Sequence, residues 1–193
     1  MERKPTLTTI AIERLHPHPD NLRKVIGDID ELAESIKASG ILQNLTVVPM
    51  NDDWTEFTVI IGHRRLAAAK QAGLTELPCA VVEMTEKEQL STMLTENMQR
   101  SDLTVYEEAK GCQLLLDLGD TVAEVAEKTG FSESKIRRRV KLCELDEEAF
   151  KESQIRQPTL QDYDRLNQIK DIEVRNELLK SIGTNNFDNR LYS

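Results

Sequence analysis

The sequence predicts an α/β domain followed by an all-helical domain that contains a helix-turn-helix. Apolar β-branched runs alternate with amphipathic stretches up to about residue 84, and the pattern beyond is helical. Between residues 121 and 142, an amphipathic stretch, a glycine-containing turn and a second, basic amphipathic stretch follow one another. The basic stretch stands out because the 193-residue chain has a net charge of −9.

The first domain is predicted from apolar periodicity and from its turn residues. Asp28 and Glu31 have the spacing of a capping box, and Gly40 is the expected helix stop. Asn51 to Asp53 form a turn between two apolar strands. We expect strands at Thr8–Ile12, Thr46–Val48, Phe57–Ile61 and Cys79–Val82, and helices at Asp28–Ser39 and Arg64–Ala72.

The rest of the chain carries repeated helix start signals. Thr-x-x-Glu sequences at Thr85 and Thr104 have capping-box spacing and open helices that run to Asn97 and Leu118. We expect an α/β domain at 1–84, a connecting helix at 85–103, and a helical domain with the helix-turn-helix and supporting helices at 104–193.

The helix-turn-helix is expected to begin with a helix over Thr121–Lys128, which Thr121 caps, and Ser132 is the natural N-cap of the second helix. Ile136, Val140 and Cys143 recur at helical spacing and should face the first helix. The outer face is then formed by Glu133, Ser134, Lys135, Arg137, Arg138 and Lys141.

The segment Ser132–Leu142 carries five Lys and Arg residues against one Glu, while the sequences before and after it are acidic. This charge inversion indicates a helix that enters the major groove of DNA. The alternative is a solvated helix face, in which the three arginines at 137–139 pair with nearby carboxylates. Those carboxylates are Glu144, Asp146, Glu147 and Glu148.

Composition excludes several classes of protein. With 39% hydrophobic and 31% charged residues and no apolar run of about 20 residues, the chain is expected to be cytoplasmic, with no membrane partner. Cys79, Cys112 and Cys143 are far apart among apolar neighbours, so we expect reduced, buried thiols. His16 and His18 lie in a proline-rich stretch that favours a surface loop over a metal site.

Two short segments have the chemistry of phosphate binding. Gly62–Arg65 joins a strand to a helix, where a tight turn presents helix-start N–H groups and two arginines. Glu96–Arg100 combines a carboxylate, an amide and a guanidinium, a set that can hold a hydrated magnesium ion and a phosphate. Taken alone, each segment is also compatible with an ordinary polar helix end.

Taken in order, these pieces resemble the ParB family of chromosome and plasmid partition proteins, which includes nucleoid-occlusion proteins. The resemblance covers roughly residues 8 to 180. Its matching stretches are Asn21–Arg23, DELAESIKASGILQNLTVVP at Asp30–Pro49, GHRR at Gly62–Arg65, ENMQRSDLTVYEEA at Glu96–Ala109, and the helix-turn-helix.

The resemblance implies that the N-terminal domain binds CTP with magnesium. Family positions that line the nucleotide correspond to Gly40, Gln43 and Asn44, and those around the phosphates correspond to Gly62, His63, Arg64 and Arg65. Glu96 and Asn97 match positions near the magnesium ion, and Arg100 matches one near the triphosphate.

Two positions depart from the family pattern. The family usually has Glu where this chain has His63, and Pro where it has Asn44. Histidine cannot replace a carboxylate that orients water or metal, so the resemblance supports CTP binding more than CTP hydrolysis. Sulfiredoxin shares this N-terminal fold, but its reductase chemistry needs a cysteine at this junction, and none is near Gly62.

The resemblance also implies double-stranded DNA as partner, with a palindromic site, a homodimer and a ParA-type ATPase. We assign DNA contacts to Thr121, Ser132, Ser134, Lys135, Arg137, Arg138 and Lys141. A helical segment at 159–182 would support the helix-turn-helix, with apolar anchors at Leu160, Tyr163, Leu166, Ile169, Leu178 and Leu179. ParB proteins normally continue into a small dimerisation domain, which is not recognisable before Ser193.

The sequence predicts a sequence-specific DNA-binding protein. The resemblance implies that it is nucleoid-associated and uses CTP and magnesium to switch between loading and clamped states. The chief alternative is a nucleotide-independent regulator of transcription or replication from a mobile element. A phosphoryl-transfer enzyme is a third class, and the lack of an acidic base at His63 counts against it.

Overall fold

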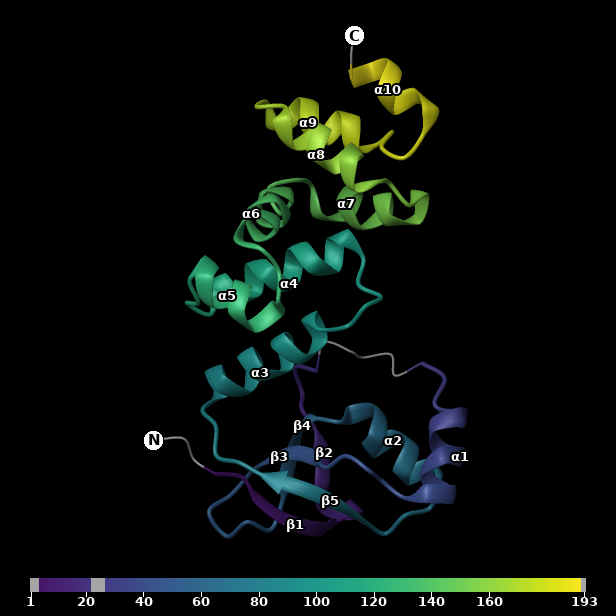
Figure 1. The fold of residues 1–193 in the computed structure, drawn as a ribbon, viewed down its shortest axis with the longest axis vertical. Helices are drawn as coiled ribbons and strands as arrows, with labels where there is room; N and C mark the ends of the chain where they lie inside the picture. Colours follow the sequence, from purple (N-terminus) through teal and green to yellow (C-terminus); the bar gives the residue numbers. More distant parts are fainter. Residues whose placement is uncertain (1–3, 22–26, 192–193) are drawn as a thin grey trace. The chain divides into compact units, whose positions relative to one another are not determined.

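The structure is a computed structural model that describes residues 4–21 and 27–191. Leu22 and Arg23, which belong to one of the predicted family stretches, lie outside the described residues. The chain divides into two compact units, Met1–Glu96 and Asn97–Ser193, and each is described by itself. The predicted order of a mixed α/β domain followed by a helical domain is confirmed (Figure 1).

The first unit contains a mixed five-stranded sheet with the order β1-β5-β3-β4-β2 in its described residues. Pairs β1–β5 and β3–β4 are antiparallel, whereas β5–β3 and β4–β2 are parallel. A short 3₁₀ helix at Ile12–Arg14 joins the first two strands. The strands are β1 (Thr6–Ala11), β2 (Leu15–Pro17), β3 (Leu45–Pro49), β4 (Phe57–Ile61) and β5 (Glu76–Val81).

The two faces of the sheet have different cores, as the alternation of side chains along a strand requires. Val47 and Val59 belong to a cluster that includes Leu66 of α2 (His63–Gln71). Their neighbours Val48 and Ile60 pack instead with Met93 of α3 (Glu86–Met98). Helix α1 (Asp30–Ser39) packs on α2 through Ala33, Ile36 and Ala68. Helix α2 is thus held between the sheet and α1.

Two predictions for this unit are wrong. The helix predicted from Asp28 begins at Asp30, because the Asp28 carboxylate accepts the N–H two residues later, at 2.9 Å, and leaves Ile29 as the N-cap. The surface loop predicted from His16 begins as a strand, since Leu15–Pro17 pairs with β4 at the sheet edge. Proline is compatible with an edge strand, where its missing N–H is not needed.

The second unit is helical throughout its described residues. One hydrophobic cluster joins most of its helices through Leu142, Phe150, Tyr163, Leu166 and Leu179. The helices are α4 (Val105–Asp117), α5 (Val122–Thr129), α6 (Glu133–Leu142), α7 (Glu147–Ser153), a 3₁₀ turn (Gln154–Arg156), α8 (Leu160–Gln168), α9 (Ile172–Leu179) and α10 (Asn185–Leu191). None of the helices in the described part of the chain is long and apolar enough to cross a membrane.

The predicted apolar anchors of this unit are mostly in its core. Tyr163, Leu166, Leu178 and Leu179 are buried. The prediction for Leu160 is wrong, because its side chain is 56% exposed. Leu160 is the first residue of α8, and side chains tilt toward the N-terminus of a helix, so this one extends past the core.

Gly111 fixes the approach of α4 to the preceding segment. It is buried in the middle of α4, and a Cβ atom at this position would lie 2.0 Å from the Met98 sulfur. Met98 is itself almost fully buried. The close approach therefore requires glycine, and it anchors the residues just before Arg100 on α4.

Candidate nucleic-acid interface and nucleotide site

Both helices of the helix-turn-helix begin at the predicted caps. Thr121 and Glu124 form a complete capping box at the start of α5, and the Ser132 hydroxyl accepts the Lys135 N–H at the start of α6. Between them, Gly130 ends α5 with φ +76°, a left-handed conformation that glycine adopts without strain. Thr121 and Ser132, both predicted DNA contacts, thus lie at the N-termini of α5 and α6.

The inner face of α6 contains more charge than the apolar pattern predicts. Ile136 and Leu142 are fully buried, as expected of a packed face, whereas Val140 and Cys143 are only half-buried. Arg139 lies among them and is 5% exposed. A buried guanidinium needs a paired carboxylate, so its partner is part of the core.

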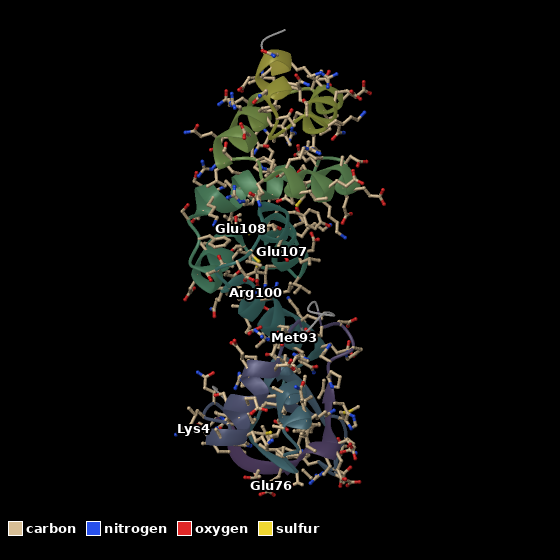
Figure 2. The ribbon with its side chains drawn as sticks, turned by 90° about the vertical axis from the view of Figure 1, so that its right-hand side faces the viewer. Lys4, Glu76, Met93, Arg100, Glu107 and Glu108 are labelled. Atoms are coloured by element: carbon tan, nitrogen blue, oxygen red, sulfur yellow. The ribbon has the colours of Figure 1, made fainter. Side chains whose placement is uncertain are left out.

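Glu108 is that partner, and it pairs with two cations of α6. Its carboxylate accepts from Arg139 Nε at 2.6 Å and from Lys135 Nζ at 2.7 Å. It projects from the first turn of α4, next to Glu107 (Figure 2). Lys135 also lies 3.5 Å from the centroid of the Phe131 ring. The prediction that Lys135 belongs to the outer face is therefore wrong: its long stem carries the ammonium back to Glu108, and the side chain is half-buried.

The outer face of α6 presents Ser134, Arg137 and Arg138 to solvent. Arg137 pairs with Glu133 one turn earlier at 2.8 Å, and Arg138 pairs with Asp164 of α8 at 3.1 Å. The three arginines 137–139 therefore have partners other than the carboxylates of the solvated-face alternative. Their side chains differ sharply in exposure, at 63%, 50% and 6% respectively. Only the first two are accessible to a ligand.

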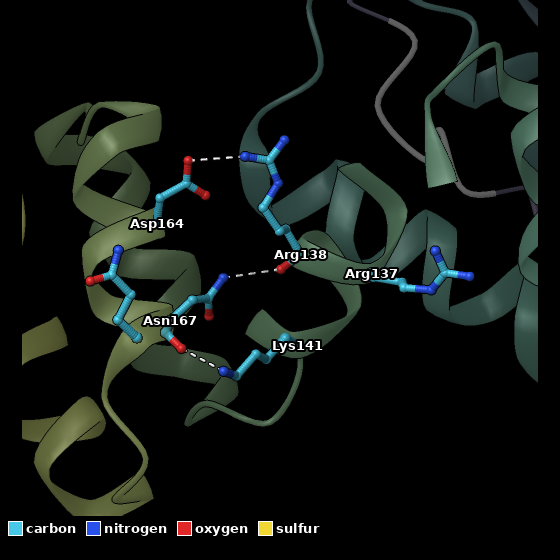
Figure 3. A pocket seen from close by; sticks show the side chains of 6 residues that line it. Arg137, Arg138, Lys141, Asp164 and Asn167 are labelled. Carbon is cyan, nitrogen blue, oxygen red and sulfur yellow. Dashed lines mark hydrogen bonds and ion pairs between the residues drawn. The ribbon is translucent and has the colours of Figure 1, made fainter. Parts of the chain in front are cut away.

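A groove of about 480 Å³ runs between α6 and α8 beside these arginines (Figure 3). Its lining has a net positive charge and contains two amides. In this groove, the Lys141 ammonium donates to the backbone carbonyl of Asn167, near the end of α8. A cation is favoured at a helix C-terminus. The residues that line the groove are Arg137, Arg138, Lys141, Asp164, Asn167 and Gln168.

Arg175 of α9 joins α6 and α8 from the interior. It is 2% exposed, pairs with Glu144 at 2.8 Å, and donates to the Lys141 carbonyl at 3.0 Å and to Asn167 Oδ1 at 3.2 Å. Sequence reasoning missed this residue, as it missed Glu108. Each forms its ion pair with a residue about thirty positions away, and local periodicity carries no signal of such a pair.

In the first unit, the junction before α2 has the geometry of an anion site. Gly62 has φ +109°, and a Cβ there would lie 2.9 Å from Leu45 Cγ, so the turn requires glycine. No side chain among the described residues caps the N-terminus of α2. Helix-start N–H groups without a capping side chain favour a bound anion.

The two arginines of this junction hold neighbouring loops. Arg65 Nη1 donates to the carbonyls of Gln43 and Asn44 at 2.7 and 2.8 Å, and Arg64 Nη2 donates to the Asp28 carbonyl at 3.0 Å. Arg64 Nε is buried without a hydrogen-bond partner in the described part of the chain. Burial lowers the pKa of the Arg65 guanidinium. The structure thus brings Gln43 and Asn44 to Arg65, whereas Gly40 ends α1 with φ +71°.

His63 is held as a neutral acceptor. Its Nε2 accepts the backbone N–H of His18 at 3.2 Å, a role that requires an unprotonated nitrogen. Burial, with a smaller contribution from His18, lowers its pKa from 6.5 to about 4. Among the described residues, no group of three or more His, Cys, Asp or Glu is placed to hold a metal ion.

The segment Glu96–Arg100 ends α3 and begins the second unit. Glu96 is exposed. Arg100 donates to Asn97 Oδ1 at 3.3 Å and to both carboxylate oxygens of Asp102, at 3.0 and 2.7 Å. Glu96 and Asn97, which are predicted to lie near magnesium, are neighbours in the sequence. Arg100, the predicted triphosphate contact, is ion-paired with Asp102.

Comparison with known proteins identifies the family. The sequence-family model of the ParB N-terminal domain matches residues 1–98 of this chain. The chain belongs to the ParB family. It is 38% identical over 143 residues to the chromosome-partitioning protein Spo0J of Thermus thermophilus, covering 73% of this chain and 52% of the relative. It is also 38% identical over 141 residues to a probable chromosome 1-partitioning protein ParB of Deinococcus radiodurans, covering 72% and 48%.

Solved structures agree with this assignment to the ParB family. The C-terminally truncated ParB of Caulobacter crescentus, complexed to the centromeric parS site, matches with a TM-score of 0.71 and 27% identity, covering 90% of this chain and 91% of that one. The pNOB8-like ParB N-domain matches with a TM-score of 0.70 and 17% identity, covering 98% and 87%, which shows a shared fold. The chain spans about half the length of the curated ParB relatives it matches.

Loss of the Glu108 charge should destabilise the second unit. In Glu108→Gln, the buried Arg139 loses its counter-ion, and we expect the free energy of unfolding to fall by about 3 kcal/mol in urea titrations followed by circular dichroism. The matched control Glu133→Gln removes an exposed i,i+4 partner and should cost at most about 0.5 kcal/mol. Equal losses in the two variants would contradict the role given to Glu108.

His63 should make the stability of the protein depend on pH. Its pKa is about 4 in the folded chain and near 6.5 when unfolded, so between these values the unfolded chain binds a proton that the folded chain does not. Its contribution is fully present above pH 6.5 and is lost as the pH falls toward 4. Unfolding titrations at several pH values should show a weaker dependence in His63→Gln, and an unchanged dependence would disprove this assignment.

Proposed function

We propose that this ParB-family chain is a sequence-specific DNA-binding protein of chromosome or plasmid partition, and that α6 is its recognition helix. The observation that carries the proposal is the division of charge on α6. The inward cations Lys135 and Arg139 are both ion-paired with Glu108, while Arg137 and Arg138 remain exposed on the outer face. The parS complex of the Caulobacter relative supports the same function.

We propose different roles for the residues predicted to contact DNA. Arginine forms bidentate hydrogen bonds with guanine in the major groove, so we assign base readout to Arg137 and Arg138, with Ser134 beside them. Thr121 and Ser132 would contact phosphates near the two helix N-termini. Lys135 and Lys141 would act mainly as supports, because their ammonium groups bind Glu108 and the α8 carbonyl.

The remaining partners follow from the class of DNA-binding motif. Helix-turn-helix proteins commonly bind two half-sites as dimers, which makes the site palindromic. We therefore propose a homodimer on palindromic double-stranded DNA, at the nucleoid. A ParA-type ATPase is the partner that a partition role implies.

We further propose that the first unit binds CTP with magnesium. The N-terminus of α2, the Gly62 turn and the buried Arg64 Nε together fit a triphosphate, and the loop with Gln43 and Asn44 would lie beside the nucleotide. Glu96 and Asn97 supply oxygen ligands of the kind magnesium uses together with phosphate oxygens. When bound, magnesium would neutralise triphosphate charge.

The chain's own residues favour nucleotide binding over hydrolysis. The neutral His63 uses its Nε2 to accept the His18 N–H, so it offers neither a carboxylate nor a free base. Nucleotide binding would then bias a clamp-like rearrangement without rapid turnover. A nucleotide-independent regulator is less well supported, because the Gly62 turn and the N-terminus of α2, which no described side chain caps, suit an anion.

Arg138→Ala should weaken specific DNA binding and leave the fold intact, because the side chain is exposed on α6. Loss of one bidentate base contact costs about 1–3 kcal/mol, which is about 5- to 150-fold in affinity. Fluorescence anisotropy with a parS duplex and a scrambled duplex measures this loss, and circular dichroism reports the fold. Arg190→Ala, which removes the same charge from exposed α10, is the control. Equal affinities of the two variants would contradict the assignment of Arg138.

Calorimetric titration with CTP, ATP and GTP in magnesium tests the nucleotide site. The unmodified chain should bind CTP selectively, and Arg64→Ala should weaken binding at least about tenfold through loss of a charge-assisted phosphate contact. Lys70→Ala removes an equal charge at the other end of α2 and should bind normally. Failure of the unmodified chain to bind any of the three nucleotides would leave a nucleotide-independent DNA-binding protein.

A further inference from the structure

We propose that Asp164 of α8 is a specificity-determining residue of the DNA interface. It holds the Arg138 guanidinium within the α6–α8 groove and so withholds this cation from the phosphates of unrelated DNA. The inference rests on the proposed DNA-binding function and adds to it a residue outside the recognition helix.

The position of Asp164 is unusual for a surface that receives DNA. It contributes the one carboxylate to a groove lining that otherwise consists of three cations and two amides (Figure 3). Its Oδ2 lies 3.1 Å from Arg138 Nη1, and the two side chains are 37% and 50% exposed. A negative charge at this point opposes the phosphates that the neighbouring cations attract.

The Asp164 carboxylate is not what joins the two helices. Asn167 Nδ2 donates to the Arg138 carbonyl at 3.2 Å, and Lys141 donates to the Asn167 carbonyl. The buried Arg175 contacts both α6 and α8 from the interior. Exposed ion pairs contribute little to stability, so the pair of Arg138 with Asp164 adds little to this framework. Its effect is on where the guanidinium points.

The pair of Arg138 and Asp164 favours the major-groove edge of a G·C base pair over a backbone phosphate. To bind a phosphate, Arg138 must leave Asp164 and the carboxylate must approach a negative charge. At a G·C pair, guanine offers two acceptors to arginine while cytosine offers an amino donor to a carboxylate. Both members of the pair are then satisfied. Asp164 therefore lowers affinity for unrelated sequence more than affinity for the specific site.

The test compares Asp164→Asn with the unmodified chain on a parS duplex and on a scrambled duplex over a range of salt concentrations. Freeing one arginine for phosphate should raise affinity for the scrambled duplex about fivefold at about 150 mM salt and steepen the salt dependence by about one counterion. Affinity for parS should rise less, so the ratio between the two duplexes falls. Glu177→Gln, an equal charge change at an exposed pair on α9, is the matched control.

A double variant tests whether Asp164 changes DNA affinity through Arg138. If Asp164 acts through Arg138, the gain from Asp164→Asn should vanish in the Arg138→Ala background. A gain in Asp164→Asn no larger than that in Glu177→Gln, or a gain that persists without Arg138, would overturn the inference. An unmodified chain that binds neither duplex would contradict the proposed function itself, and the inference with it.

Discussion

The bridge from Glu108 to Arg139 and Lys135 is the interaction on which the DNA-binding unit depends. Helix α6 must bury one face against α4 and α5, yet it carries basic residues on its inner face as well as on its outer face. A single carboxylate from α4 forms ion pairs with both inward cations, at 2.6 and 2.7 Å. The apolar residues Ile136 and Leu142 can then pack, and the remaining arginines point outward. The ion pairs of Glu108 thus fix α6 and leave only its outward arginines accessible to a ligand.

The two units hold their cationic side chains in different ways. In the second unit, α6 is held by carboxylates and, through Arg175 and Lys141, by the end of α8. In the first, Arg64 and Arg65 donate to backbone carbonyls of loops, and no carboxylate in the described part of the chain is hydrogen-bonded to either. Guanidinium groups held by carbonyls keep their positive field, as the proposed triphosphate site requires. Ion pairs fix α6 for the proposed contact with DNA. Backbone carbonyls hold Arg64 and Arg65 without cancelling the charge that the proposed nucleotide site needs.

Whether the sequence could predict an interaction depended on how far apart its two residues lie along the chain. The caps at Thr104, Thr121 and Ser132 depend on residues three positions apart, and the structure confirms all three. Glu108 and Arg175 form pairs across about thirty positions, so no local pattern indicated them, and Lys135 was placed on the wrong face. The strand at Leu15–Pro17 was missed because its partner, β4, is about forty residues away. The phosphate-binding chemistry at 62–65 and 96–100 was inferred from the residues, and the assignment of CTP from the family resemblance. Both remain predictions.

Selection of DNA from a random duplex library by the unmodified chain tests the central claim most directly. Specific helix-turn-helix proteins bind their sites roughly a thousandfold or more tightly than other DNA. We predict that the bound pool converges on one short palindromic sequence with G·C pairs at symmetric positions. A bound pool with no sequence in common would show that α6 provides only nonspecific charge, and would contradict the account.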